Sequence, residues 1–248
     1  MKKEIIYEVK NILGNIFTII FGFIFPTLMT IILYNAIKAD INITDINYLK
    51  IHLFVSNAVM IPLAIVFVGF VALFSQEIEK GVVLRMSLFG YTEKRQLKAK
   101  FISQLIVVFI SLLLYSIIII PVLKIPEINM LGFVYILISY LILTVLFFII
   151  GFSISLLTKR FSVSFGITMS LYFIIMILSG MMGVSSDDLP FLLKQISYVL
   201  PTNHLIKNSY NLWNNIGFEL TGLIISFIIF IIISTVLYFI AFKNRKNY

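Results

Sequence analysis

Residues 53–74 read LFVSNAVMIPLAIVFVGFVALF, a run of 22 residues without a charged side chain. About 20 predominantly apolar residues cross the hydrocarbon core of a bilayer as a helix, so this stretch predicts a membrane span. Five further stretches meet the same criterion, and like the first they contain no Lys, Arg, Asp or Glu: residues 16–37, 101–123, 131–157, 161–183 and 220–242. The sequence therefore predicts an all-α integral membrane protein with six transmembrane helices, organised as a single domain over residues 1–248.

The composition points to the same class of protein. Of the 248 residues, 60% are hydrophobic and 12% are charged, and the mean hydropathy is +1.08. A soluble domain carries about 25% charged residues, so a cytosolic enzyme or a secreted domain is excluded. The chain has no cysteine and two histidines, which excludes a disulfide framework, a cysteine nucleophile and a thiolate or histidine-rich metal site. We expect no catalytic residue, cofactor site or metal site in this chain.

The net charge of +8 is unevenly distributed. If the N-terminus lies inside the cell, 14 of the 19 Lys and Arg residues fall in cytoplasmic segments. The outer segments keep five: Lys38, Lys50, Lys124, Lys194 and Lys207. Basic residues are enriched on the cytoplasmic side of membrane proteins. This bias predicts a multi-pass protein of the cell membrane with both termini in the cytoplasm, and it explains the charge without a nucleic-acid partner.

Two cytoplasmic segments that do not span the membrane have helical patterns. In residues 2–14 one helical face is apolar, formed by Ile5, Ile6, Val9, Ile12 and Leu13. An amphipathic helix with basic flanks lies in the membrane interface, so we expect an interfacial elbow helix there. In residues 76–90 apolar positions again share a face, which predicts a cytoplasmic helix that Gly90 ends. A second helix, from about Thr92, is expected to run into the third span.

The outer segment 187–214 predicts a helical hairpin. Asp188 can cap a helix with Pro190 in its first turn, where proline is tolerated. Pro201 breaks this helix, and a second apolar stripe follows it. Each helix is about a dozen residues long and too short to span. We therefore expect a re-entrant hairpin in the outer leaflet, with Tyr210 and Trp213 near the interface.

The charge-free spans bear on the possible mechanisms. Ion-coupled carriers use ionisable groups within the membrane, although the carbonyls of broken helices can also hold an ion. A standalone carrier or channel therefore remains an alternative. His204 and Asn208 stand four apart, as in some membrane-embedded proteases, but Glu77 and Glu79 are predicted on the opposite side. No Gly-Lys dipeptide occurs, so the chain has no phosphate-binding P-loop.

Two motifs, in this order along the chain, resemble those of a known family. The first follows the second span and consists of Glu77-Ile-Glu79-Lys80-Gly81, Arg85 and Gly90. The second lies between the fifth and sixth spans and consists of Leu189-Pro190, Ile196-Ser197 and Leu200-Pro201. With six spans and an N-terminal interfacial helix, this order resembles the ABC-2 type permeases, the membrane subunits of type V ABC exporters. Gly90 stands where many members carry proline.

The resemblance implies a complex. Two permease subunits, identical or related, would pair around a path lined by spans one, two and five. An ABC ATPase subunit, which binds ATP and Mg, would dock beneath each. The elbow helix 2–14 and the coupling helix 76–90 would rest on the ATPase, with docking residues Glu77, Glu79, Gly81 and Arg85. The expected function is export of a hydrophobic or amphipathic substrate, a peptide or a drug, across a bacterial plasma membrane.

Overall fold

The computed structural model describes residues 1–38, 46–181, 186–217 and 220–245. Within these ranges the ordered elements are all helices, and six of them are long and apolar enough to cross a membrane, which confirms the six-helix prediction. Their bounds are Ile16–Ile37, Ile46–Glu79, Glu93–Leu123, Met130–Thr158, Phe161–Leu178 and Leu220–Asn244.

The first two of these long helices are each built from three consecutive pieces. Ile16–Ile37 comprises α2 (Ile16–Ile19), the π-helical turn η1 (Ile20–Ile24) and α3 (Phe25–Ile37). Ile46–Glu79 comprises α4 (Ile46–Pro62), the π-helix η3 (Leu63–Phe70) and α5 (Val71–Glu79). The other four long helices are α7 (Glu93–Leu123), α8 (Met130–Thr158), α9 (Phe161–Leu178) and α13 (Leu220–Arg245).

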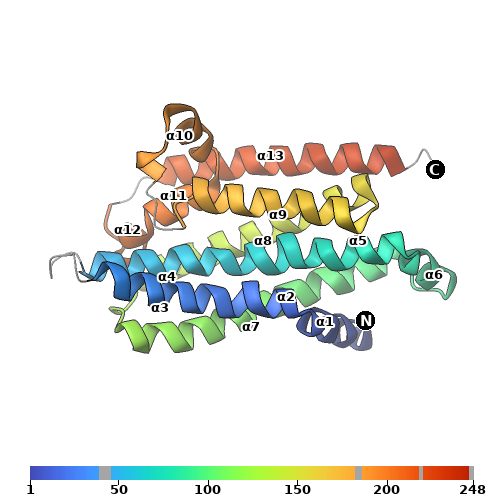
Figure 1. Ribbon diagram of the computed structural model, residues 1–248, viewed down its shortest axis with the longest axis horizontal. Coiled ribbons are helices and arrows are strands. Elements are labelled where there is room, and N and C mark those ends of the chain that lie inside the picture. The colour runs from blue at the N-terminus through green and yellow to red at the C-terminus, as the bar shows by residue number, and fades with distance from the viewer. Residues whose placement is uncertain (39–45, 182–185, 218–219, 246–248) are drawn as a thin grey trace.

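The long helices run side by side along the long axis of the molecule (Figure 1). At one end lie the N-terminus, α1 (Lys2–Gly14), the short helix α6 (Val82–Leu88) and the last turns of α13. At the opposite end lie α10 (Phe191–Ser197), α11 (Pro201–Lys207) and α12 (Ser209–Asn214). We call these the α6 end and the α10 end. The segments predicted to be cytoplasmic thus share one end of the bundle.

The second span is the central helix. In its most apolar stretch 94% of the residues are buried inside the protein, against 22–50% in the other five spans. Rings of α8 pack on it, with Phe148 stacked on Phe70 at 4.5 Å between centroids. Gly151 of α8 allows this approach, because a Cβ there would lie 2.7 Å from Val71 Cγ2. The helix is therefore enclosed by the rest of the bundle.

Spans one and two touch where both are π-helical. Pro62 lacks the N–H needed to continue an α-helical ladder, and η3 begins directly after it. Small residues let helices approach closely in a membrane. A Cβ at Gly69 would lie 2.7 Å from Thr18 Oγ1, and one at Gly22 would collide with the side chain of Ile65. The two irregular segments are thus in direct contact.

The prediction of one helix over residues 76–90 is wrong. Residues up to Glu79 are the last turns of α5, and a separate helix, α6, begins at Val82. Gly81 lies between them with φ 66°, a left-handed conformation that glycine adopts without strain. Gly90, at φ 85°, follows the end of α6, and α7 begins after Thr92, as expected.

The outer segment also differs from the prediction. Residues Ser186–Asp188 form a 3₁₀ turn, α10 begins at Phe191 after Pro190, and Pro201 is the first residue of α11. The segment is thus three helices of six or seven residues rather than two of a dozen. The helix of span five ends at Leu178, before Gly180 at φ 77°, so the predicted end at residue 183 is wrong. Residues 182 and 183 lie outside the described ranges.

Candidate functional site

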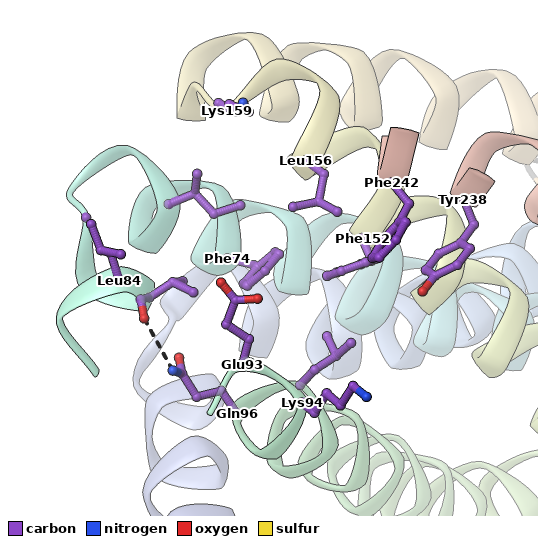
Figure 2. A pocket seen from close by; sticks show the side chains of 14 residues that line it. Phe74, Leu84, Glu93, Lys94, Gln96, Phe152, Leu156, Lys159, Tyr238 and Phe242 are labelled. Atoms are coloured by element: carbon purple, nitrogen blue, oxygen red, sulfur yellow. Dashed lines mark hydrogen bonds between the residues drawn. The ribbon is translucent and has the colours of Figure 1, made fainter. Parts of the chain in front are cut away.

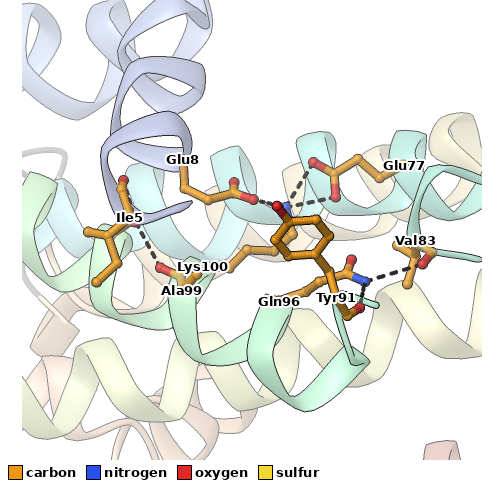
Figure 3. Close-up of polar contacts among 9 residues, drawn as sticks. Ile5, Glu8, Glu77, Val83, Tyr91, Gln96, Ala99 and Lys100 are labelled. Carbon is orange, nitrogen blue, oxygen red and sulfur yellow. Dashed lines mark hydrogen bonds and ion pairs between the residues drawn. The ribbon is translucent and has the colours of Figure 1, made fainter. Parts of the chain in front are cut away.

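A buried lysine joins three helices at the α6 end. Lys100 of α7 is 5% exposed, and its Nζ lies 2.8 Å from Glu8 Oε1 of α1 and 2.7 Å from Glu77 Oε2 of α5. Figure 3 shows the two carboxylates converging on this ammonium group. A buried charge is tolerated only when it is paired. We call these three residues the Lys100 cluster, which fixes α1, α5 and α7 to one another.

Neighbouring contacts extend this junction. Arg95 forms an ion pair with Glu4 of α1, and its hydrogen bonds lower the pKa of the Glu4 carboxyl below its ordinary value. Ser103 Oγ donates to the carbonyl of Ile5 at 3.1 Å. The Gln96 side-chain amide donates to the carbonyls of Val83, at 3.3 Å, and Tyr91, at 2.7 Å (Figure 3). The first turns of α7 therefore hold both α1 and the segment that carries α6.

The structure uses the two predicted docking carboxylates within the chain. Glu77 belongs to the Lys100 cluster, and Glu79 Oε2 accepts a hydrogen bond from the backbone N–H of Phe161 at 2.8 Å. An acidic group at the start of a helix satisfies a free N–H and complements the helix dipole. Glu79 thus links the end of α5 to the start of α9. The family resemblance implies a docking role for both carboxylates, whereas in the structure each has a partner within the chain.

The other predicted site residues are in two places. Gly81 forms the turn between α5 and α6, and Arg85 is exposed on α6, where its Nη2 donates to the carbonyl of Lys80 at 3.1 Å. Pro190 and Pro201 lie at the α10 end, so the structure does not bring them together with the loop residues.

The sequence pattern includes Phe89 in the apolar face of the predicted helix 76–90, but sequence reasoning missed Leu84 and Leu88 of the short helix. Leu84 is 64% exposed, and Leu88 and Phe89 are each 79% exposed. We call these three the α6 patch. Exposed apolar residues that cluster outside a membrane span mark an interaction surface. Leu84 and Leu88 are four apart, the spacing of one helical face, and this signal could have identified them.

A family model described as ABC-2 family transporter protein matches residues 47–243. The chain belongs to the ABC-2 transporter family. It is therefore a multi-pass membrane protein and a transmembrane component of a transporter, and members of the ABC-2 family work with an ATPase subunit. Neither the comparison with curated proteins nor that with solved structures gave a match.

The ABC-2 match covers the central span, the α6 patch and the α10 end, but it begins after α1. Two of the three residues of the Lys100 cluster, Glu77 and Lys100, lie inside the matched range. Within the described residues, no three His, Asp or Glu side chains are grouped in a way that could hold a metal ion. The described residues at this end form ion pairs and a helix cap, and they include an exposed apolar patch.

Proposed function

We propose that this chain is the permease subunit of an ATP-driven exporter and that the α6 patch is where its ATPase subunit docks. The observation that carries the proposal is the combination of family membership with an exposed apolar helix at the end predicted to be cytoplasmic. Apolar side chains on a short helix outside the spans are unfavourable in water, so a partner surface is their natural environment. Arg85 on the same helix supplies a charged contact at the rim of this interface.

The Lys100 cluster would pass movement from the docked ATPase to the spans. A displacement of α6 reaches α5 directly through the Gly81 turn and reaches α7 through the hydrogen bonds of Gln96. Glu77 and Lys100 join α5 to α7, and Glu8 adds the elbow helix α1. In this mechanism Glu77 and Glu79 act as positioning residues inside the permease, and the apolar residues of α6 make the contact.

The substrate is proposed to be hydrophobic or amphipathic, with a peptide or a drug favoured. The six predicted spans contain no charged side chain that would pair with a charged cargo. A second permease subunit, identical or related, would complete the path. Spans one and five have exposed apolar faces that include Leu28 and Ile32 on α3 and Ile167 and Ile174 on α9. Of the three spans that the family resemblance places around the path, span two is enclosed, which leaves the outer faces of spans one and five for a second subunit.

The docking proposal is tested by co-purification. The tagged chain is co-expressed with the candidate ABC ATPase subunit, and Leu84→Gln is combined with Leu88→Gln. We expect less co-purified ATPase and loss of ATP-driven transport in liposomes, with unchanged helix content. The matched control is Leu192→Gln with Ile196→Gln, two exposed apolar residues at the same spacing at the α10 end. Full recovery of the ATPase with the α6 double variant would contradict the proposal.

A reversal of charge at Glu77 and Glu79 separates docking from positioning. If these residues only faced the ATPase, Glu77→Lys with Glu79→Lys would leave the isolated permease intact. Here it places a second lysine beside Lys100 and removes the acidic cap of α9. We therefore expect a lower unfolding temperature of the isolated chain, measured by circular dichroism in detergent. An unchanged unfolding temperature would contradict the positioning role.

A standalone carrier is the second candidate, and one observation favours it. The α-helix of span two is interrupted at Pro62, where a π-helix follows. Asn57 lies about one turn before Pro62, and its buried Oδ1 has no hydrogen-bond partner among the described residues. Irregular segments of this kind coordinate ions in some carriers. Transport in liposomes that contain only the chain and an ion gradient would favour this candidate. Transport that requires the ATPase subunit and ATP would favour the exporter.

A further inference from the structure

A groove with a cavity volume of about 790 Å³ opens at the α6 end (Figure 2). It lies between the α5–α6 segment, the first turns of α7 and the last turns of α8 and α13. Aromatic rings form one wall: Phe74 of α5 stacks on Phe152 of α8 at 5.5 Å between centroids, and Phe152 stacks on Tyr238 of α13 at 6.2 Å. Phe242 extends the row, at 6.0 Å from Tyr238. A continuous row of rings from three helices thus lines the groove.

The rim of the groove is charged and has a net positive charge. Lys94 lies in the first turn of α7, and Lys159 is the residue that ends α8, in a left-handed conformation with φ 53°. Both side chains are exposed, and Glu93 is the one acidic residue among the described residues that line the groove. Figure 2 places Lys94 and Lys159 on opposite sides of the aromatic row. The groove therefore combines an apolar interior with two cationic groups at its mouth.

We propose that this groove binds an anionic phospholipid, with an acyl chain along the aromatic row and the headgroup at the basic rim to which Lys94 and Lys159 contribute. The volume is within the range of about 300–1,000 Å³ that small-molecule sites occupy. Lysines just outside membrane spans attract anionic headgroups, and their apolar stems pack along the lipid. An apolar interior alone would accept any acyl chain, whereas the basic rim selects an anionic headgroup.

Access from the bilayer favours a lipid over a soluble ligand. Two of the bounding helices, α7 and α13, are membrane spans with exposed apolar side chains, such as Ile102 and Ile106 on α7 and Phe239 on α13. A lipid can enter between them without leaving the membrane. Leu84, which also belongs to the α6 patch, borders the groove at the side away from Tyr238 and Phe242 (Figure 2). A docked ATPase would therefore cover the α6 side and leave the α13 side to the lipid.

The test uses the purified, delipidated chain in mild detergent and native mass spectrometry. Phosphatidylglycerol and phosphatidylcholine with identical acyl chains are titrated separately, and we expect tighter binding of phosphatidylglycerol. Lys94→Gln with Lys159→Gln should weaken phosphatidylglycerol binding by roughly 10- to 30-fold and leave phosphatidylcholine binding unchanged. The control is Lys10→Gln with Lys98→Gln, two exposed lysines at the same end that do not line the groove. It should bind like the unmodified chain.

Three outcomes would overturn the lipid site. The first is equal binding of both lipids, and the second is equal weakening by the control pair, which would indicate general surface attraction. The third is displacement of phosphatidylglycerol by excess inorganic phosphate or by the ATPase subunit, which would assign the groove to a free anion or to the docking interface. The inference does not depend on ATP-driven export, because the lipid is measured on the chain alone. Loss of ATPase co-purification therefore tests docking separately.

Discussion

The two ends of the molecule use the same ion-pair chemistry with different consequences. At the α6 end the ammonium group of Lys100 is buried between carboxylates of two other helices. At the α10 end Asp187, with its side chain 47% exposed, pairs with Lys194 at 3.2 Å and with Lys207 at 2.8 Å. Water and salt screen an exposed pair, whereas a buried charge without its partner is strongly unfavourable. The first set of pairs fixes helices, and the second only links neighbouring short segments.

At the α10 end, close contact between backbones rather than a buried ion pair holds the helices α8 and α12 together. A Cβ at Gly132, in the first turn of α8, would collide with the carbonyl oxygen of Leu212 in α12. The backbone N–H of Asn129 donates to the carbonyl of Trp213 at 3.0 Å, and the indole N–H of Trp213 donates to the carbonyl of Pro126 at 3.0 Å. Trp213 is thus buried within the protein.

The largest expected effect is at Lys100. Replacing it in Lys100→Met leaves Glu8 and Glu77 close together without their cation, and breaking a buried ion pair typically lowers the free energy of unfolding by about 3–5 kcal/mol. The measurement is reversible unfolding of the purified chain in detergent, followed by circular dichroism. The control is Lys98→Met, an exposed lysine two residues away in α7, which should change stability by no more than about 0.5 kcal/mol. Equal stability of the two variants would mean that the Lys100 cluster does not fasten the helices.

A smaller effect is expected at Gly132. In Gly132→Ala the added methyl group must displace the backbone of α12, and overpacking of this kind typically lowers stability by about 1–3 kcal/mol. The matched control is Gly166→Ala in α9, where nothing lies within 4 Å of the added Cβ. Alanine is the better helix former, so the control should be neutral or more stable by about 0.5–1 kcal/mol. If both variants behave alike, the α10 end is not held by this contact.

The smallest effect is expected at Asp187. Hydrogen bonds from Lys207, and next from Lys194, lower the pKa of the Asp187 carboxyl below its ordinary value of 3.8. Because the folded pKa is the lower one, this stabilisation is complete above pH 3.8 and is lost as the pH falls through the folded pKa. Asp187→Asn should therefore lower stability near neutral pH by less than about 1 kcal/mol.

The response to pH and salt distinguishes the exposed pair from the buried one. The difference between Asp187→Asn and the unmodified chain should shrink in acid and in high salt, because both remove or screen the carboxylate charge. The effect of Lys100→Met should persist in high salt, since its partners are buried. An effect of Asp187→Asn that is independent of salt would contradict the assignment of a screened surface pair.

Local patterns in the sequence predicted the spans well, and they failed where contacts come from distant residues. The apolar runs are long and free of charge, so their number follows from the chain alone. The central position of span two in the bundle does not follow from the chain alone. Lipid and protein interiors are equally apolar, so hydropathy does not distinguish a helix that faces lipid from one that is enclosed by protein. The charge pattern places Lys100 among the basic residues of a cytoplasmic segment, and its partner Glu8 lies 92 residues away. No local signal connects the two.

The α6 region shows how a periodic pattern can hide a break. Ile78, Val82 and Met86 repeat every four residues across Gly81, so the sequence favours one continuous helix. The structure turns at Gly81, since glycine alone among these residues adopts a positive φ without strain. The turn separates Glu79, which caps α9, from the exposed residues of α6. The carboxylates and the apolar patch therefore have separate roles, although they are close in the sequence.

The enclosure of the second span has a consequence for which amino-acid substitutions this helix can tolerate. A helix at the edge of the bundle touches protein on one side and lipid on the other, so harmful substitutions in it should recur about every 3.6 residues. The most apolar stretch of the helix Ile46–Glu79 is almost wholly buried among its neighbours. In a saturation mutagenesis experiment its profile should lack that rhythm and show intolerance at nearly every position. A span no more apolar than its lipid-facing neighbours would then be the one in which apolar residues are least interchangeable.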